Sequence, residues 1–364
     1  MDFNLTGEQE LLRDGLTKFL AARYDLAESR SAAKTGPGWQ PEIWRAFADE
    51  LGILGATFPE DIGGIGGGPI ELMVIAEALG HALVIEPYVG TVVVAGGLLV
   101  RAGTEAAHAL LEQIAAGTAV VALADGPGIT ARADGDGWVL SGSAAVVTDA
   151  PLATHLLIAA DTGRGTGLFL TEFDAAAPPA GLTVHGYRTI DDRRAADLEL
   201  DDVRLAAPLV GDATAELDRA RDEAAAAVCA EAVGGMRKVL ADTVEYCKQR
   251  QQFGQPIGSF QALQHRMVDM YMEVEQAVAA VYLAILNLEA DPDVRARSVS
   301  AAKAVVGRAA RFVGQNAVQL HGGMGMTEEL AIGHYFKRLT AVQYEFGSTD
   351  YHLSRYATIS RPGA

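Results

Sequence analysis

Apolar residues recur at helical spacing along the first third of the chain. Thr6 and Gln9 form a capping-box signature, and the apolar positions that follow are three and four residues apart. Helical spacing continues over 43–51, 70–83 and 91–116. The glycine-rich stretch 58–69 follows no strand and precedes no Lys-Ser/Thr pair, so we expect an interhelical loop rather than a phosphate loop. We predict an all-helical N-terminal domain over residues 1–118.

The pattern changes near Ala119 to short apolar runs that are separated by Asp-Gly, Gly and Pro turns. These runs lie at 120–124, 137–142, 144–148, 154–158 and 167–171, and 189–203 adds more strand-like sequence. Such runs are typical of consecutive antiparallel strands. The stretch lacks the alternating helices of a parallel nucleotide-binding sheet. We predict a small antiparallel β domain over residues 119–210.

Long helical patterns return after residue 210. We expect helices at 213–249, 260–289, 294–320, 327–343 and 348–360, several of them long enough to form a bundle. Their alanine-rich faces suit oligomer interfaces. The chain therefore reads as an α+β protein, with a C-terminal four-helix-bundle domain over residues 211–364.

Composition narrows the possible partners. The 364 residues are 49% hydrophobic and 21% charged, and the formal net charge is −18, which argues against a nucleic-acid or anionic-membrane partner. Cys229 and Cys247 fall in apolar helical sequence, so we expect buried thiols rather than a disulfide. With no signal segment and no run of about 18 apolar residues, a soluble cytoplasmic protein is expected. No metal site is expected.

Two segments contain the groups that hold a nucleotide cofactor. The first is Arg250-Gln-Gln-Phe-Gly-Gln-Pro-Ile-Gly-Ser-Phe-Gln261, and the second is Gln319-Leu-His-Gly-Gly-Met-Gly325. An arginine offers a permanent positive charge and a planar donor fork to a pyrophosphate. Amide side chains bind neutral polar edges, and paired glycines let the backbone approach closely. Arg250 could instead be a surface cation and Phe253 a core residue, but the spaced set favours a cofactor site.

The order of domains and these motifs resemble the acyl-CoA dehydrogenase family over essentially the whole chain. Within it, the phrases 259–266, 311–323 and 334–340 resemble the small subunit of pimeloyl-CoA dehydrogenase. The resemblance implies FAD bound across a subunit interface and α,β-desaturation of an acyl-CoA. In that chemistry a carboxylate removes the α proton and the β hydrogen leaves as hydride to the flavin. It also implies an electron-transferring flavoprotein as acceptor.

The resemblance also assigns cofactor residues. Arg250 and Gln319 would hold the pyrophosphate and adenosine parts of FAD, and Thr148 could bond an edge of the flavin ring. The remaining cofactor positions that the resemblance implies are Gln252, Phe253, Gln261, Leu320, Gly322, Gly323, Ser348 and Asp350.

The sequence departs from the family at the catalytic base. The usual glutamate before a Gly-Thr pair is replaced by Phe346, and the alternative position on the first long C-terminal helix is Ala224. Glu223 misses that second position by one residue and is the candidate base. Glu345 and Glu231 are also near, although a shift of one residue in a helix turns a side chain by about 100°.

The end of the site that faces the flavin ring is also altered. The family's Thr-Glu-Pro loop corresponds here to 123–130, which lacks that signature, and Val146 takes the place of a tryptophan. This asymmetry fits the smaller, non-catalytic subunit of a heteromeric α2β2 enzyme. Heteromeric actinobacterial steroid-type dehydrogenases, which the chain also resembles, are built in this way, and a bulky steroid-derived or dicarboxylic acyl-CoA would suit it.

Three alternatives remain open from the sequence. One is a self-sufficient homotetramer that uses Glu223 or Glu345 as a displaced base. Another is a flavin-free structural or acyl-CoA-binding homologue. The third is an oxygen-using relative, which would release peroxide.

Overall fold

The computed structural model describes residues 4–361 and divides by contacts into two compact units. Unit 1 comprises residues 1–26, 69–84 and 225–364, and unit 2 comprises 27–68 and 85–224. This grouping differs from the three sequential domains predicted above, because the first helix and the helix at 69–82 belong to the same unit as the C-terminal helices. The bounds of the three predicted domains stay a prediction.

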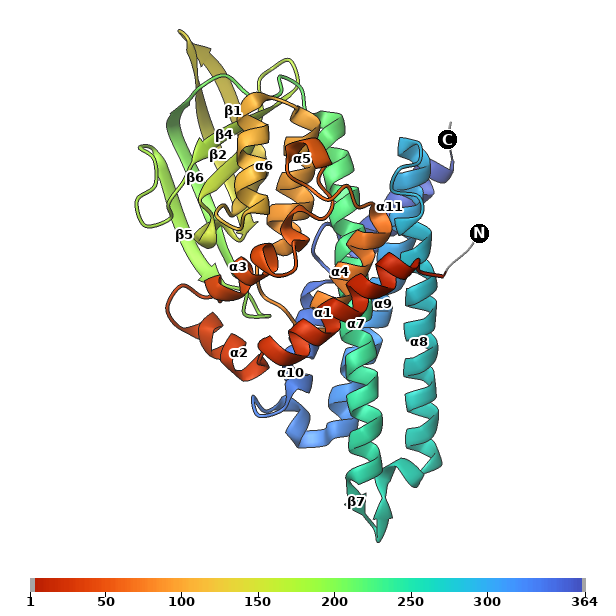
Figure 1. Cartoon of the computed structure of the whole chain (residues 1–364). Coiled ribbons are helices and arrows are strands. Elements are labelled where there is room, and N and C mark those ends of the chain that lie inside the picture. Colours follow the sequence, from red (N-terminus) through yellow and green to blue (C-terminus); the bar gives the residue numbers. More distant parts are fainter. Residues whose placement is uncertain (1–3, 362–364) are drawn as a thin grey trace. The chain divides into compact units, whose positions relative to one another are not determined.

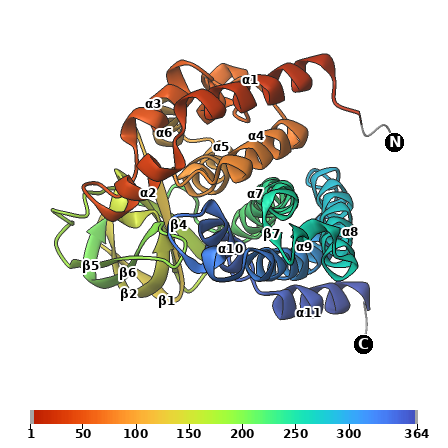
Figure 2. The ribbon, with the colours of Figure 1, turned by 90° about the horizontal axis from the view of Figure 1, so that it is seen from below.

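Unit 1 is built from helices, which Figure 1 shows coloured by sequence. They are α1 (Gly7–Arg23), α4 (Pro69–Ala82), the 225–249 part of α7 (Thr214–Gln249), α8 (Gln261–Ile285), α9 (Pro292–His321), α10 (Ala331–Ala341) and α11 (Thr349–Ser360). The long helices α8 and α9 run side by side, and α11 lies along α9 (Figures 1 and 2). The five C-terminal helices predicted from periodicity all form. The Thr6 capping box forms too, with the Gln9 amide N–H donating to Thr6 Oγ1 at 3.3 Å.

The interior of unit 1 is lined mainly by alanine and valine, which allows close helix contacts. At the crossing of α4 and α7, a Cβ added to Gly80 would lie 1.9 Å from the Glu231 carbonyl oxygen. A Cβ added to Gly234 would lie 1.9 Å from the carbonyl oxygen of Glu77. Only glycine is compatible with this spacing, so the two backbones touch at this crossing.

Unit 2 contains one six-stranded sheet and several helices. The strands are β1 (Val121–Asp134), β2 (Gly137–Thr148), β3 (His155–Asp161), β4 (Thr166–Glu172), β5 (Leu182–Arg188) and β6 (Arg194–Leu205). The helices are α2 (Leu26–Lys34), α3 (Pro41–Asp49), the π-helical η3 (Val89–Gly96), α5 (Gly97–Ala102), α6 (Glu105–Ala115) and the start of α7. The stretch 58–69 is an irregular connection with one short 3₁₀ turn, η2 (Glu60–Ile62).

The prediction of a purely antiparallel sheet was wrong at one pair of strands. The strand order is β4-β3-β1-β2-β6-β5, and β1 pairs with β3 in parallel, with Val121 opposite His155. After β2 the chain crosses the end of β1 through the short 3₁₀ helix η4 (Ala150–Leu152) and returns on the far side of β1. Turn residues reveal where strands end but not on which side the next strand pairs, so the sequence did not reveal this crossover.

The predicted single helix at 91–116 is also corrected. The chain there forms η3, α5 and α6, with a break at Gly103, whose φ is +59°. Within residues 4–361, no helix combines the length and apolar character needed to cross a lipid bilayer.

Candidate functional site

The first cofactor-like segment forms a small hairpin at the end of α7. Strands β7 (Gln251–Gln252) and β8 (Gln255–Pro256) pair, and Phe253 and Gly254 form the turn with φ of +55° and +78°. Two positive φ angles are typical of a type I′ turn, which a phenylalanine rarely adopts. The Phe253 ring is 91% exposed and meets Phe260 edge-on at 6.0 Å. Phe253 is therefore not a core residue of this chain.

The second segment lies at the same end of unit 1. The ring of His321, which is buried at the end of α9, stacks on Tyr246 of α7 at 4.2 Å. The Tyr246 hydroxyl donates to the His321 carbonyl oxygen at 3.5 Å, and the amide N–H of Arg250 donates to the Tyr246 carbonyl oxygen at 2.8 Å. Residues 250–261 and 319–325, about sixty positions apart in sequence, are thus brought together.

The glycines beside this contact leave open space. Gly322 ends α9 with φ +62° and ψ −143°, a conformation that is essentially restricted to glycine. A Cβ added at Gly322 or at Gly323 would meet no atom within 4 Å. These glycines are therefore not required by packing within the chain, and their backbone is accessible to a ligand.

The polar side chains of residues 250–261 and 319–325 that were predicted to contact a cofactor are exposed to solvent. Within residues 4–361 the Arg250 guanidinium has no ion pair, although the protein has 47 acidic residues. Gln252, Gln261 and Gln319 are exposed, and Leu320 is buried with 6% exposure. An unpaired fork-shaped cation, nearby amides and open glycine backbone suit a pyrophosphate-bearing nucleotide.

The loop at the family's usual base position is held tightly. Phe346 has φ +52°, and its carbonyl oxygen is 2.9 Å from His352 Nε2. The ammonium of Lys303, fully buried on α9, donates to the carbonyl oxygens of Val342 and Gly347, each at 2.8 Å. Burial lowers the pKa of Lys303. The chain thus keeps a strained, braced loop at a position that now holds no proton acceptor.

Ser348 and Asp350 follow this loop. Ser348 is the N-cap of α11, with its hydroxyl accepting from the Tyr351 amide at 3.2 Å. Asp350 is exposed in the first turn. No nucleotide contact for either residue is shown, so their cofactor role stays a prediction.

Glu345 and Glu231 bind the same arginine. Arg338, 4% exposed, donates to both oxygens of Glu231 at 2.7 and 2.9 Å and to both oxygens of Glu345. Two carboxylates share one buried guanidinium, so neither is an unengaged base.

Glu223, the candidate base, is also engaged. Both of its oxygens accept from Arg101 Nη1, at 3.0 and 3.1 Å, and Oε1 accepts from Arg219 at 2.8 Å. Ala224 beside it is fully buried. The Glu223 carboxylate is therefore engaged by two guanidiniums and is not an unengaged base. Its catalytic role remains untested.

The predicted flavin-ring residues lie in unit 2. Thr148 ends β2 opposite Ala195, and the ladder bulges between Ala144 and Val147. Val146 is in this bulge with φ +55° and 58% exposure, and its amide donates to Asp197 Oδ1 at 2.8 Å. The stretch 123–130 belongs to β1. Thr148 therefore lies in a different unit from Arg250 and Gln319.

Sequence reasoning missed Lys303, His352 and Arg338, which hold the loop around Phe346. The sequence did contain one signal for Lys303. This lysine interrupts a face of alanines and valines on a predicted helix, and a lysine that is buried there requires hydrogen-bond or charged partners. The targets of Lys303 are backbone carbonyl groups, which no sequence pattern reveals.

Comparison with known proteins identifies the family. The model described as acyl-CoA dehydrogenase, N-terminal domain, matches residues 6–118, and the model of the C-terminal domain of the same family matches residues 215–359. Acyl-CoA dehydrogenase IpdE2 of Mycolicibacterium smegmatis is 33% identical, covering 92% of this chain and 93% of that protein.

Solved structures agree. A chain of the ChsE4-ChsE5 complex from Mycobacterium tuberculosis superposes with a TM-score of 0.92 at 27% identity, covering 100% of both chains. A chain of the Tcur3481-Tcur3483 steroid ACAD superposes with a TM-score of 0.88 at 30% identity, covering 97% of each.

Proposed function

Because the chain belongs to the acyl-CoA dehydrogenase family, whose members are oxidoreductases acting on CH–CH bonds of acyl-CoA, we propose that it is the smaller, non-catalytic subunit of a heteromeric member. In this proposal it binds the nucleotide end of FAD, and a homologous partner subunit provides the flavin-ring contacts and the base in an α2β2 assembly. The observation that carries the proposal is that the Arg250 guanidinium has no ion pair within residues 4–361 while Phe346 occupies the usual position of the base.

The nucleotide end fits this role through its own residues. Arg250 would bind the pyrophosphate as a charged fork, and the exposed amides of Gln261 and Gln319 would bind adenosine edges. The open backbone at Gly322 and Gly323 would let the cofactor approach closely. Phe253, exposed on its hairpin, would cover an apolar part of the nucleotide. FAD, when bound, would accept hydride from the acyl group.

The chain's own residues give little support for proton abstraction. Phenylalanine and alanine at the two usual base positions cannot accept a proton. The neighbouring Glu223 and Glu345 are each hydrogen-bonded to arginine. A general base must be within reach of the α proton, and these hydrogen bonds hold both carboxylates against arginine side chains.

The acyl group is proposed from the relatives. One similar structure is named a steroid ACAD and another is a complex of two differently named chains. A bulky steroid-derived or dicarboxylic acyl-CoA is the corresponding substrate class for this chain, with an electron-transferring flavoprotein as acceptor.

The nucleotide contact is tested by Arg250→Ala in the co-purified assembly, with Arg164→Ala as control. Arg164 is exposed in the connection between β3 and β4 of unit 2. A charge-assisted contact contributes about 1.5–3 kcal/mol, so flavin affinity should fall roughly ten- to hundredfold. The flavin-to-protein ratio after gel filtration measures the loss. An unchanged ratio in Arg250→Ala would refute the assignment.

A further inference from the structure

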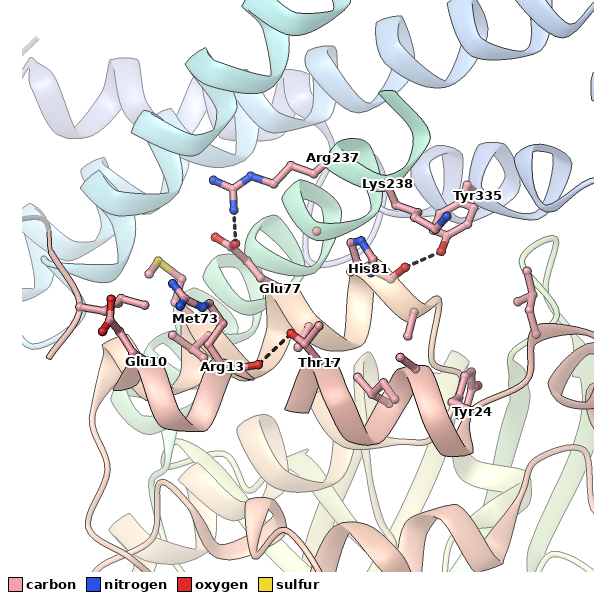
Figure 3. Close-up of a pocket in the computed structure, with 18 of the residues that line it drawn as sticks. Glu10, Arg13, Thr17, Tyr24, Met73, Glu77, His81, Arg237, Lys238 and Tyr335 are labelled. Carbon is pink, nitrogen blue, oxygen red and sulfur yellow. Dashed lines mark hydrogen bonds and ion pairs between the residues drawn. The ribbon is translucent and has the colours of Figure 1, made fainter. Parts of the chain in front are cut away.

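Unit 1 contains a cavity of about 810 Å³ that shares no residue with the two cofactor-like segments or with the 342–348 loop. We call it the α1–α4 cavity, because most of its lining comes from these two helices, with additions from α7, α8 and α10. Figure 3 shows residues of α1 and α4 facing each other across it. Its volume lies within the usual range of small-molecule sites.

The cavity follows from the glycine crossing of α4 and α7. Gly80 and Gly234 bring these backbones into contact, which fixes the spacing of the two helices. Around this crossing, three of the lining positions of α4 and α10 are alanines: Ala78, Ala82 and Ala331. Since the helices are held by the crossing and cannot close over these alanines, space is left beneath α1.

One part of the lining is apolar. Leu20, Met73 and Val74 line it and are 4%, 2% and 5% exposed. Tyr24 and Tyr335, also lining, are 8% and 2% exposed. This part would accept an apolar molecular body and exclude water from it.

Two arginines line the same cavity from different helices. Among the described residues Arg13 of α1 forms an ion pair only with its neighbour Asp14, and both side chains are about half exposed or more, at 49% and 68%. Such a pair is worth little and is easily exchanged. Arg237 of α7 donates to Glu77 Oε2 at 2.7 Å, and its other donors have no partner within residues 4–361 (Figure 3).

Lys238 is less available than these arginines. Its ammonium already donates to both oxygens of Asp242, at 2.6 and 2.8 Å. Of the two carboxylates that line the cavity, Glu10 is exposed to solvent and Glu77 is bound by Arg237. Two guanidiniums with spare donors beside an apolar wall suit an anionic ligand with an apolar body.

We propose that the α1–α4 cavity binds an amphipathic carboxylate, an organic acid with an apolar body, at a site separate from the cofactor. Arg13 and Arg237 bind the carboxylate, and Leu20, Met73 and Val74 contact the body. A monoanion is preferred to a phosphate monoester, because Glu77 and Glu10 offset part of the positive charge. Burial raises the pKa of Glu77, and Arg237 lowers it.

The test is calorimetric titration of the purified full chain with dodecanoate, and with dodecanol as the uncharged analogue. We expect one saturable site per chain for dodecanoate and at least about tenfold weaker binding of dodecanol. Arg237→Met and the exposed Arg13→Met should each weaken dodecanoate binding about tenfold, whereas Arg308→Met on the exposed face of α9 should not. Ala78→Phe should fill the cavity and remove binding.

Because Arg13 is exposed, its variant should fold even if Arg237→Met does not. Arg250→Ala should leave dodecanoate binding unchanged, which separates this site from the proposed nucleotide contact. No saturable binding up to about 1 mM would overturn the proposal. Binding that survives both Ala78→Phe and Arg13→Met would overturn it as well.

Discussion

Arg338 neutralises two carboxylates in the interior of unit 1, and its replacement by methionine tests that role. The Arg338 and Glu231 side chains are each 5% exposed, and the Glu345 side chain is 25% exposed. Arg338→Met keeps an apolar chain of similar length but removes the cation. Glu231 would then stay buried without this guanidinium.

The expected cost follows from that burial. Removing one partner of a buried ion pair costs about 3–5 kcal/mol, because the remaining charge is desolvated without compensation. For a chain of this size each kcal/mol corresponds to about 2 °C or less, so the melting temperature should fall by at most about 6–10 °C. Glu231→Gln in the Arg338→Met background should recover much of the loss, since it removes the stranded charge.

Thermal unfolding followed by circular dichroism at pH 7 measures both effects. Arg308→Met, on the exposed face of α9, is the matched control and should shift the transition little. A melting temperature of Arg338→Met within about 1 °C of the wild type would contradict the proposed role of Arg338. The same role would be contradicted if the variant with both Arg338→Met and Glu231→Gln is no more stable than Arg338→Met alone.

Three further predictions follow from individual side chains. If Glu223 is an ion-pair partner rather than a base, Glu223→Gln should change the turnover of the assembled enzyme less than about threefold. The same substitution should lower the free energy of unfolding by about 1–3 kcal/mol. A loss of turnover beyond about a hundredfold, without unfolding, would restore Glu223 as the base. Burial raises the pKa of Cys229 to about 12 and also raises the pKa of Cys247. Neither thiol should therefore react with an aromatic disulfide reagent at pH 8 until denaturant is added. Fast reaction of the native protein would contradict this prediction. Burial raises the pKa of Glu77, so the folded state binds this proton more tightly than the unfolded state and the carboxylate costs stability as pH rises through that pKa. Glu77→Gln should therefore be more stable than the wild type at pH 7, and this difference in the free energy of unfolding should vanish below the ordinary glutamate pKa. Urea titrations that give the same difference in free energy at pH 4 and at pH 7 would disprove the prediction.

Local sequence rules predicted the helices of the C-terminal region well. Helix α7 was expected at 213–249 and forms over Thr214–Gln249, because its apolar spacing is long and unbroken. Turn residues also located most strands. They did not indicate the parallel pairing of β1 with β3, which depends on how the chain crosses the sheet. The grouping of α1 and α4 with the C-terminal helices depends on long-range packing and was likewise not predicted.

The candidate site was predictable only where the sequence itself contains the chemistry. Arg250 and Gln319 were proposed from residue type and from the family resemblance, and their cofactor role stays a prediction. The Tyr246–His321 stack explains how their segments meet. The engagement of Glu223 by Arg101 joins residues 122 positions apart, which no local pattern encodes. The bracing of the 342–347 loop by Lys303 depends on backbone carbonyls and required the fold.

The central claim is that this chain holds part of an FAD whose chemistry requires another subunit. The most direct measurement is the flavin content and acyl-CoA turnover of the chain purified alone, compared with the chain co-purified with its homologous partner, using an artificial electron acceptor. We predict little flavin and no turnover for the chain alone, and stoichiometric flavin with turnover for the assembly. Full flavin content together with turnover by the chain alone would contradict the account.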